Sequence, residues 1–311
     1  MTQERPDVLA NPRSERAKRV AALSGRSARS RTGLILVEGP QAVRELLAHR
    51  GETVRDVYFT EAAAQRYGQL WEAARRVTRY VHLVSQAVAD AMSGDAQGII
   101  AVADAAAVAA RLERWEGARL VVVLAEAQDP GNVGTIIRLA DACGAQAVVI
   151  AKGGADATSP KVIRSSVGSV FHLPIVRGVE FGAAVAELRG AGMQVLAAHG
   201  YGEVSLEELL VASLNGGAKT STAAEQAGGQ AAQPDLGGAT KGPAKGPAKG
   251  PELGGPTAWV FGNEARGLSE AELAACDASV RIALRGHAES FNVAGAAAIL
   301  LHASSLAQAR G

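Results

Sequence analysis

The sequence predicts an α/β protein in which a smaller α/β unit precedes a larger one built on a mostly parallel sheet. Three observations support this fold class. Segments with strand and helix character alternate along the 311 residues, as in proteins whose strands are joined by helical crossovers. A continuous apolar run at Leu120–Ala125 is typical of a parallel strand buried on both faces. Apolar residues make up 48% of the chain, which is enough for one or two hydrophobic cores.

The first unit combines short strands with amphipathic helices. Its strands are expected at Leu34–Glu38, Val54–Thr60, Tyr80–Val84 and Ile99–Ala103. Its helices are expected at Pro40–Arg50, Glu61–Arg76 and Ser85–Met92, the first beginning with the proline that helix starts favour. These elements predict a domain at residues 16–105, after a flexible tail at residues 1–15 and before a linker at residues 106–116.

The second unit, residues 117–311, repeats the alternation on a larger scale. Its strands are expected at Leu120–Ala125, Ala147–Ala151, Phe171–Val176, Gln194–His199, Ala258–Phe261 and Ser279–Leu284. Its helices are expected at Val133–Cys143, Ser159–Val167, Phe181–Ala191, Leu206–Leu210, Glu270–Ala275 and Asn292–Ala309. Residues 215–256 interrupt the series with 11 Gly and 5 Pro and without Val, Ile or an aromatic residue. Such a segment buries too little surface to offset its ordering entropy, so we expect a disordered insertion.

The formal net charge of +1 hides an uneven distribution. Between Arg13 and Arg31, seven basic residues stand against one acid, Glu15, so this window carries +6 and the remainder about −5. A basic segment beside a weakly acidic body fits a polyanion-binding surface. A solubilising, partly disordered N-terminus has the same composition, and charge alone does not choose between the two.

Composition excludes several classes of protein. The two cysteines, Cys143 and Cys276, can supply neither a disulfide framework nor a four-ligand zinc site, and we expect no metal. No apolar run approaches the roughly 18 residues that span a bilayer. The arginine-rich N-terminal segment lacks the apolar core of a secretory signal. We therefore expect a cytoplasmic protein without a membrane partner.

Ligands of parallel α/β sheets gather at the carboxyl ends of the strands, and three such ends carry unusual residues. After the first strand of the second unit, Asn132 stands where a helix N-cap is wanted. Gly134 allows another backbone or a ligand to approach the first helical turn. Arg138 lies farther along the same helix, where an ion pair with Asp141 is the commoner role of such an arginine.

The other two strand ends carry a glycine-rich loop and a helix start. Glu264 lies between Gly262 and Gly267, which expose backbone donors and acceptors to a ligand. By itself Glu264 would equally suit an ordinary loop acid. Ser290 and Asn292 precede the alanine-rich last helix, and an N-cap alone would explain either residue.

Taken together and in this order, these segments resemble the motifs of the SpoU (TrmH-like) branch of the SPOUT methyltransferases. Motif 1 is matched by Asn132-Val-Gly-Thr-x-x-Arg138, motif 2 by Phe261-Gly-Asn-Glu264-x-x-Gly267, and motif 3 by Ile282 and Ser290-x-Asn292-Val-Ala. Lys161 to Pro174 is similar to a further recurring stretch of the family. The resemblance covers residues 119–309 apart from the insertion. It implies a SPOUT fold with a parallel sheet and a C-terminal trefoil knot.

The N-terminal unit has a resemblance of its own. Arg26–Arg31, followed by Gly33-Leu-Ile-Leu-Val-Glu-Gly39, resembles the start of the L30e-like substrate-binding domain of rRNA-directed members. This implies that residues 16–105 bind RNA.

The resemblance implies a methyltransferase that uses S-adenosylmethionine to methylate an RNA ribose 2′-hydroxyl. Its catalytic residues would be Arg138, Asn132, Glu264, Ser290 and Asn292. The cofactor would be held around Gly262, Asn263, Ile282, Leu284 and Phe291. RNA would be bound by Arg26, Arg29, Arg31 and Arg164. Family members act as dimers, which implies a homodimer with the last helix as its candidate interface, although a core helix would have the same apolar character.

The chain departs from the family pattern at two places. Ala283-Leu284 stands where the family usually has Pro-Met, and Phe291 stands where it usually has Leu. Both changes stay apolar and affect the shape of the adenine pocket.

Three other functions fit the sequence less well than that of an rRNA methyltransferase. The N-terminal domain favours 23S rRNA as substrate, with a tRNA methyltransferase of the same family and a non-catalytic RNA-binding protein as alternatives. A dinucleotide-binding oxidoreductase is disfavoured because the G-x-G-x-x-G spacing is absent.

Overall fold

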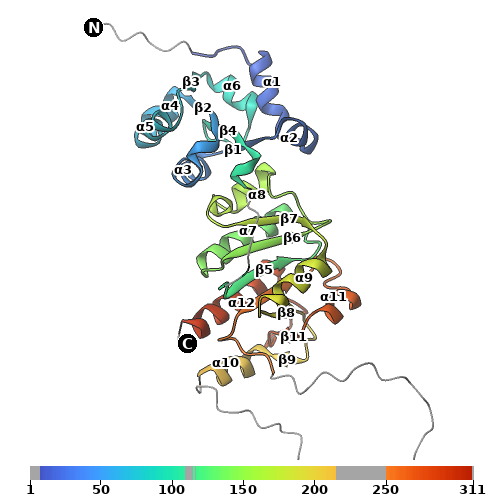
Figure 1. Ribbon diagram of the computed structural model, residues 1–311. Coiled ribbons are helices and arrows are strands. Elements are labelled where there is room, and N and C mark those ends of the chain that lie inside the picture. Colours follow the sequence, from blue (N-terminus) through green and yellow to red (C-terminus); the bar gives the residue numbers. More distant parts are fainter. Residues whose placement is uncertain (1–7, 109–114, 116, 215–249, 310–311) are drawn as a thin grey trace, which may run out of the picture.

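The computed structural model describes residues 8–108, 115, 117–214 and 250–309. It consists of two α/β domains stacked end to end, with the smaller, N-terminal domain at the top of the view in Figure 1. The smaller domain runs from α1 to η2 and the larger from β5 to α12. None of the helices among these residues combines the length and the apolar character needed to cross a membrane.

The smaller domain holds a mixed sheet of strand order β1-β4-β2-β3. β1 and β2 run antiparallel to β4, whereas β2 and β3 are parallel. The strands are β1 (Leu34–Glu38), β2 (Val54–Thr60), β3 (Val81–Val84) and β4 (Ile99–Asp104). The helices are α1 (Glu15–Ala22), α2 (Arg26–Thr32), α3 (Pro40–His49), η1 (Gly51–Thr53), α4 (Glu61–Arg66), α5 (Gly68–Val77), α6 (Gln86–Met92) and η2 (Ala105–Ala107).

The larger domain holds an all-parallel sheet of strand order β7-β6-β5-β10-β8-β11-β9. Its strands are β5 (Leu120–Leu124), β6 (Ala147–Ala151), β7 (Ile175–Val179), β8 (Gln194–Ala198), β9 (Val204–Ser205), β10 (Thr257–Phe261) and β11 (Ala278–Arg281). Its helices are α7 (Pro130–Ala142), α8 (Pro160–Ser165), η3 (Ser169–Phe171), α9 (Phe181–Gly190), α10 (Leu206–Leu214), α11 (Glu270–Ala275) and α12 (Val293–Gln308). The predicted α/β fold with a parallel sheet is confirmed, and the trefoil knot stays a prediction.

Two apolar layers enclose the parallel sheet. Successive strand residues point to opposite faces, and β5 shows this alternation. Val122 and Leu124 belong to the cluster that contains the buried faces of α7, α10 and α12. Val121 and Val123 belong to the cluster that contains α9 and the end of α11. Because both faces are covered, the strand is apolar throughout, as its unbroken run of Val and Leu predicts.

The start of the described chain is tied to the smaller domain. Leu9 forms a parallel bridge with Val84. The Leu9 N–H donates a hydrogen bond of 2.9 Å to the Leu83 carbonyl, and the Ser85 N–H donates one of 3.0 Å to the Leu9 carbonyl. The prediction of a flexible tail is therefore wrong for residues 8–15, and its first part, residues 1–7, lies outside the described residues.

Three predicted elements differ in the structure. The helix expected at residues 61–76 is interrupted at Tyr67, whose φ of −117° and ψ of 47° are not helical. The extended segment expected to begin at Phe171 begins only at Ile175, as β7, because Phe171 is the last residue of the 3-10 helix η3. The strand expected to reach Leu284 ends at Arg281. Short apolar runs fit a strand and a buried turn equally well, which explains the error at Phe171.

The end of the predicted disordered insertion is ordered. Leu253 is only 1% exposed, and the Glu252 N–H donates a hydrogen bond of 3.0 Å to Oε1 of Gln194. The Thr257 N–H then donates one of 2.7 Å to the Arg119 carbonyl at the amino-terminal edge of the sheet. The prediction is thus wrong for residues 250–256, while residues 215–249, like residues 109–114 and 116 of the predicted linker, lie outside the described residues.

Candidate functional site

The first motif forms the amino-terminal turn of α7. The helix begins at Pro130 and its N-cap is Asp129, whose Oδ1 accepts a hydrogen bond of 2.8 Å from the Asn132 N–H. This bond is the main cause that holds the pKa of the Asp129 carboxyl below its ordinary value. The prediction of Asn132 as N-cap is wrong because proline starts the helix before it. The Asn132 side chain therefore remains available to other loops.

Gly134 brings α7 against α8. A Cβ atom at this position would lie 2.0 Å from Oγ of Ser165 and 2.5 Å from the carbonyl oxygen of Val162. The close approach that the sequence predicts is made here by the backbone of another helix. Ser165 Oγ also donates a hydrogen bond of 3.1 Å to the Pro130 carbonyl, so α8 supports the first turn of α7.

Glu264, in the loop after β10, braces the segment that leads into α7. Its Oε2 accepts a hydrogen bond of 3.3 Å from the Gln128 N–H, and its Oε1 accepts one of 3.2 Å from the Asp129 N–H. Nδ2 of Asn132 donates a further bond of 3.5 Å to Oε1. Both carboxylate oxygens therefore accept hydrogen bonds from the turn before α7, and one of them also from Asn132 of the first motif.

Asn263 shapes the same loop from within. Its backbone pairs with that of Gly267 through hydrogen bonds of 3.1 and 2.9 Å. Its Nδ2 donates a bond of 3.1 Å to the Glu126 carbonyl, and its Oδ1 accepts one of 2.9 Å from the Ala265 N–H. These hydrogen bonds fix the conformation of the glycine-rich loop, although it forms neither a helix nor a strand.

Asn292 connects the third motif to the first. Its Oδ1 caps α12 by accepting hydrogen bonds from the N–H groups of Ala294 (2.9 Å) and Gly295 (3.4 Å). Its Nδ2 donates a bond of 3.3 Å to Oδ1 of Asn132. Asn292, and not Ser290, is thus the cap, and a continuous chain of side chains runs from Glu264 through Asn132 to Asn292.

A cavity of about 420 Å³ opens between these loops. It is lined by all the residues predicted to hold the cofactor and also by Glu264 and Ser290. Three apolar side chains of the lining are unusually exposed: Tyr201 at 89%, Phe291 at 44% and Leu284 at 39%. The volume suits a small molecule, and the exposed side chains offer apolar surface that such a molecule would cover.

The sequence did not predict one group of residues that lines this cavity. The last residue of β8, Ala198, and the three residues after it, up to Tyr201, also line the cavity. The His199 N–H donates a hydrogen bond of 3.0 Å to the Val280 carbonyl, which holds these residues beside β11. The carboxyl end of another parallel strand was the signal that could have found them.

Arg138 lies apart from the cavity lining. It is exposed on α7 and makes no hydrogen bond or ion pair with any residue that the structure describes. The alternative of an ion pair with Asp141 is wrong, because Asp141 Oδ2 instead accepts a hydrogen bond of 2.7 Å from Nδ1 of His172. The structure therefore gathers Asn132, Glu264 and Asn292, whereas Arg138, farther along α7, has no partner among the described residues.

Family comparisons bear on both domains. A family model described as RNA 2′-O ribose methyltransferase substrate binding matches residues 36–109. The model of the SpoU rRNA Methylase family matches residues 119–302, more than half of the chain. The chain belongs to the SpoU rRNA methylase family. The family predicted from the three motifs is thereby confirmed.

Relatives of this SpoU protein include named RNA methyltransferases. It is 35% identical over 190 residues, 61% of this chain and 59% of that protein, to the 23S rRNA (guanosine(2553)-2′-O)-methyltransferase RlmP of Bacillus subtilis (strain 168). It is 25% identical over 276 residues, 86% of this chain and 96% of that protein, to the 23S rRNA (guanosine-2′-O-)-methyltransferase RlmB of Bordetella pertussis. The solved structure of the SpoU methyltransferase AviRb from Streptomyces viridochromogenes with AdoMet shares 26% identity and a TM-score of 0.70, covering 96% of this chain and 100% of that chain.

One arginine predicted to bind RNA in this SpoU protein instead joins the two domains. Arg26 and Arg31 of α2 are exposed, but Arg29 between them is only 5% exposed. Its Nη2 lies 2.8 Å from Oδ2 of Asp156, and its Nε donates a hydrogen bond of 3.3 Å to Oγ1 of Thr158. The prediction for Arg29 is therefore wrong, because α2 turns this side chain toward the larger domain.

The ion pair between Arg29 and Asp156 changes the pKa of the Asp156 carboxyl. Burial alone would raise the pKa of Asp156, but hydrogen bonds from Arg29 and Thr158 outweigh it and hold this pKa below its ordinary value. The contacts at the domain interface therefore stabilise the ionised form of Asp156.

Arg164 is engaged at the same interface. Its guanidinium pairs with Glu38, which is only 5% exposed, and lies 2.8 Å from Oδ2 of Asp95. Both acids belong to the smaller domain. Its contacts therefore do not support the predicted role in RNA binding, and Arg26 and Arg31 remain as candidates.

Proposed function

We propose that this protein transfers a methyl group from S-adenosylmethionine to a ribose 2′-hydroxyl of ribosomal RNA. The chain of side chains from Glu264 through Asn132 to Asn292 carries this proposal, since it joins the three family motifs beside one cavity. Relatives named as 23S rRNA methyltransferases and the match to a substrate-binding family favour 23S rRNA over tRNA. An rRNA substrate also fits a cytoplasmic location.

The cavity suits S-adenosylmethionine in size and in lining. Phe291 and Leu284 present exposed apolar surface, between which an adenine ring would be covered, and backbone groups around Gly262 and Ile282 would serve its polar edges. Ala283-Leu284, which replaces the usual Pro-Met, keeps this surface apolar. When bound, S-adenosylmethionine supplies a methyl group on a positively charged sulfur, which makes the sulfur a good leaving group.

Arg138 is the residue we assign to the attacking hydroxyl. An arginine stays protonated in proteins, so its guanidinium would donate hydrogen bonds to the developing alkoxide and would not accept the proton. It is exposed, and no residue in the described part of the chain engages it. We assign Glu264 a structural role, because its carboxylate holds the turn before α7 through hydrogen bonds from the Gln128 and Asp129 N–H groups. We assign the proton to an RNA phosphate or to water.

A second cavity, of about 830 Å³, lies between the two domains and suits a phosphate backbone. Its lining includes Arg26 of the smaller domain and Lys152 and Arg177 of the larger one. Each phosphate that such side chains neutralise releases counterions, so RNA binding should weaken steeply with salt. Together with the exposed Arg31, this cavity supports an RNA path along the domain interface.

We assign the homodimer interface to α10 and α12, which lie side by side. Ile299 and Leu306, two turns apart on α12, are 37% and 52% exposed, and Val211 of α10 is 57% exposed. Apolar side chains gathered in this way are typical of surfaces that another subunit covers. Sedimentation coupled to an activity assay tests the assignment, and a fully active monomer would contradict it.

Labelled methyl transfer tests the function directly. The full-length protein is incubated with S-adenosylmethionine carrying a labelled methyl group and with bulk unmodified rRNA or tRNA, and the modified ribose is then mapped. We expect label in 23S rRNA at one 2′-O position. Label in tRNA alone would contradict the assignment of 23S rRNA as the substrate. Binding of RNA without any methyl transfer would favour the alternative of a non-catalytic RNA-binding protein.

A further inference from the structure

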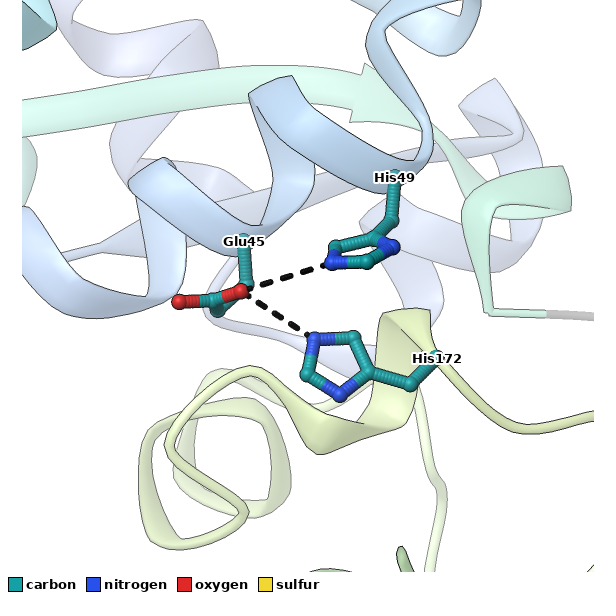
Figure 2. A group of neighbouring side chains, drawn as sticks. All are labelled: Glu45, His49 and His172. Atoms are coloured by element: carbon teal, nitrogen blue, oxygen red, sulfur yellow. Dashed lines mark hydrogen bonds and ion pairs between the residues drawn. The ribbon is translucent and has the colours of Figure 1, made fainter.

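Two histidines and a glutamate meet where the two domains touch. Glu45 and His49 lie one turn apart on α3 of the smaller domain, and His172 follows η3 of the larger domain. Figure 2 shows Glu45 beside the two imidazole rings, which lie close to each other, with dashed lines from its carboxylate to both. Glu45 and His172 are 25% exposed and His49 is 48% exposed. The cluster is thus partly buried but reachable from solvent.

The ligand atoms have the spacing of a metal site. Oε2 of Glu45 lies 3.2 Å from Nε2 of His172 and 3.6 Å from Nε2 of His49. One ligand atom from each of the three residues lies within 4.8 Å of the others. In a tetrahedral zinc complex with bonds of about 2.0–2.1 Å, the ligand atoms are about 3.3 Å apart. The three side chains therefore need only small adjustments to share one ion.

The charges also favour a cation at this point. Nδ1 of His172 donates a hydrogen bond of 2.7 Å to Oδ2 of Asp141, which in the neutral ring leaves the lone pair of Nε2 facing the carboxylate of Glu45. A second ring proton or a bound cation can bridge these two atoms, which lie 3.2 Å apart, and a metal ion would engage His49 as well. Among the described residues, no lysine or arginine forms an ion pair with Glu45 or Asp141. A divalent ion would balance the two carboxylates.

The surroundings hold the cluster together. Metal-bound histidines usually donate their other ring N–H to a carboxylate, which fixes the tautomer, and Asp141 occupies this place for His172. Gly168, with φ of +93°, lies so close to α3 that a Cβ atom there would come within 2.6 Å of Cβ and Cγ of Glu45. The close approach of this glycine sets Glu45 beside the segment that carries His172.

We propose that Glu45, His49 and His172 bind one divalent transition-metal ion of the zinc type, which bridges the two domains. Three protein ligands leave a fourth position for water on the solvent side of His49. Asp141 is a positioning residue that acts through His172. The site is separate from the proposed cofactor cavity, which none of these four residues lines, so its role is to hold the domains in register. The sequence alone predicts no metal because Glu45 and His172 are 127 positions apart.

Metal titration of the full-length protein tests the proposal. Protein freed of metal with a chelator is titrated with Co²⁺, followed by visible absorption, and with Zn²⁺, followed by calorimetry. We expect one equivalent of each ion per chain, displacement of Co²⁺ by Zn²⁺, and a higher melting temperature with Zn²⁺. His49→Gln and His172→Gln should abolish all three effects. His82→Gln is the matched control, because His82 pairs with a single carboxylate, Asp56, at 2.8 Å outside the cluster.

Each contrary result is informative. Absence of stoichiometric binding by the wild-type protein would overturn the proposal, and so would undiminished binding in His172→Gln or loss of binding in His82→Gln. If the histidine variants fail to fold, Asp141→Asn decides, because it keeps all three ligands. It should weaken Zn²⁺ binding by about 10- to 100-fold, and an unchanged affinity would refute the positioning role on which the site is built.

Discussion

The side-chain amide of Asn292 donates a hydrogen bond of 3.3 Å to the side-chain oxygen of Asn132, 160 positions earlier in the chain. Asn292 also caps α12, and Asn132 lies in the first turn of α7. One amide thus ties the starts of two helices together. Because Asn132 also reaches Glu264, the relative positions of the three motif loops depend on this pair.

The pair can be broken without removing the cap. In Asn292→Asp the carboxylate oxygens can still accept the N–H groups at the start of α12, but the donor to Asn132 is lost and a negative charge faces its side-chain oxygen. We expect methyl transfer to fall by at least about tenfold, which corresponds to about 1.4 kcal/mol, with little change in melting temperature. In Asn292→Ala the cap is also lost, at about 0.5–2 kcal/mol, and the melting temperature should fall as well. Full activity of Asn292→Asp would show that the bond does not organise the site.

Arg138→Ala should separate chemistry from cofactor binding. If its guanidinium stabilises the developing alkoxide, the methyl transfer rate should fall by about 10²–10³-fold, the usual effect of removing one such donor. Arg138 does not line the proposed cofactor cavity, so the affinity for S-adenosylmethionine, measured by calorimetry, should stay within about twofold. Turnover close to wild type would remove Arg138 from the mechanism.

Arg29 and Arg26 lie on the same short helix and should behave in opposite ways. Arg29→Ala removes a buried guanidinium and leaves the partly buried Asp156 with Thr158 and the more distant Arg177 as its remaining partners, so it should lower the melting temperature by several degrees. Arg26→Ala changes an exposed side chain and should leave the melting temperature unchanged. It should instead weaken RNA binding and reduce its salt dependence. Equal loss of RNA affinity in both variants at full stability would contradict the structural role of Arg29.

The domain interface should weaken in acid. The pKa of Asp156 is lowered in the folded protein, so its stabilising effect is complete above the ordinary carboxyl pKa of about 4 and is lost as the pH falls through the lowered value. Neutral Asp156→Asn lacks this dependence. The difference in melting temperature between wild type and this variant should therefore shrink as the pH is reduced from about 5 to about 3. A constant difference in melting temperature over that pH range would show that Asp156 does not cause the loss of stability in acid.

Two helical glycines provide a packing test. Gly134→Ala places a methyl group against Ser165 and Val162, and overpacking of this kind costs about 1–3 kcal/mol. Gly295→Ala meets no atom within 4 Å and should stabilise α12 by up to about 1 kcal/mol, the difference in helix propensity. Chemical denaturation of both variants measures the contrast. Equal stability of the two variants would mean that α8 can move away from α7 at little energetic cost.

The strands and the motif loops of the larger domain could be predicted from the sequence for a physical reason. A parallel strand covered on both faces must be apolar throughout, so Leu120–Leu124 and Ala147–Ala151 stand out from their surroundings. Ligand sites of such sheets lie at carboxyl ends, so the residues just beyond these strands were the ones to inspect. This reasoning points to Asn132, Glu264 and Asn292, whose side chains the structure joins by hydrogen bonds.

Side-chain direction could not be predicted in the same way. A count of positive charge treats Arg26 and Arg29 alike, yet the rotation of α2 exposes one and buries the other. The N-cap of α7 was misplaced because Asn132 and Asp129 both suit a cap, and only the helix start at Pro130 decides between them. Contacts between the domains, such as that of Glu45 with His172, depend on how the domains dock, which local sequence patterns do not encode.

The place where the glycine- and proline-rich segment rejoins the fold has a practical consequence. Residues 250–256 lead into β10 at the edge of the sheet where Arg119 and Gln194 lie, whereas the proposed cofactor cavity opens at the opposite edge, beyond Phe261. A biotin acceptor sequence introduced between residues 215 and 249 would therefore attach the protein to a sensor surface from behind. The cavity would face the flowing solution, so that cofactor binding could be recorded on the immobilised protein.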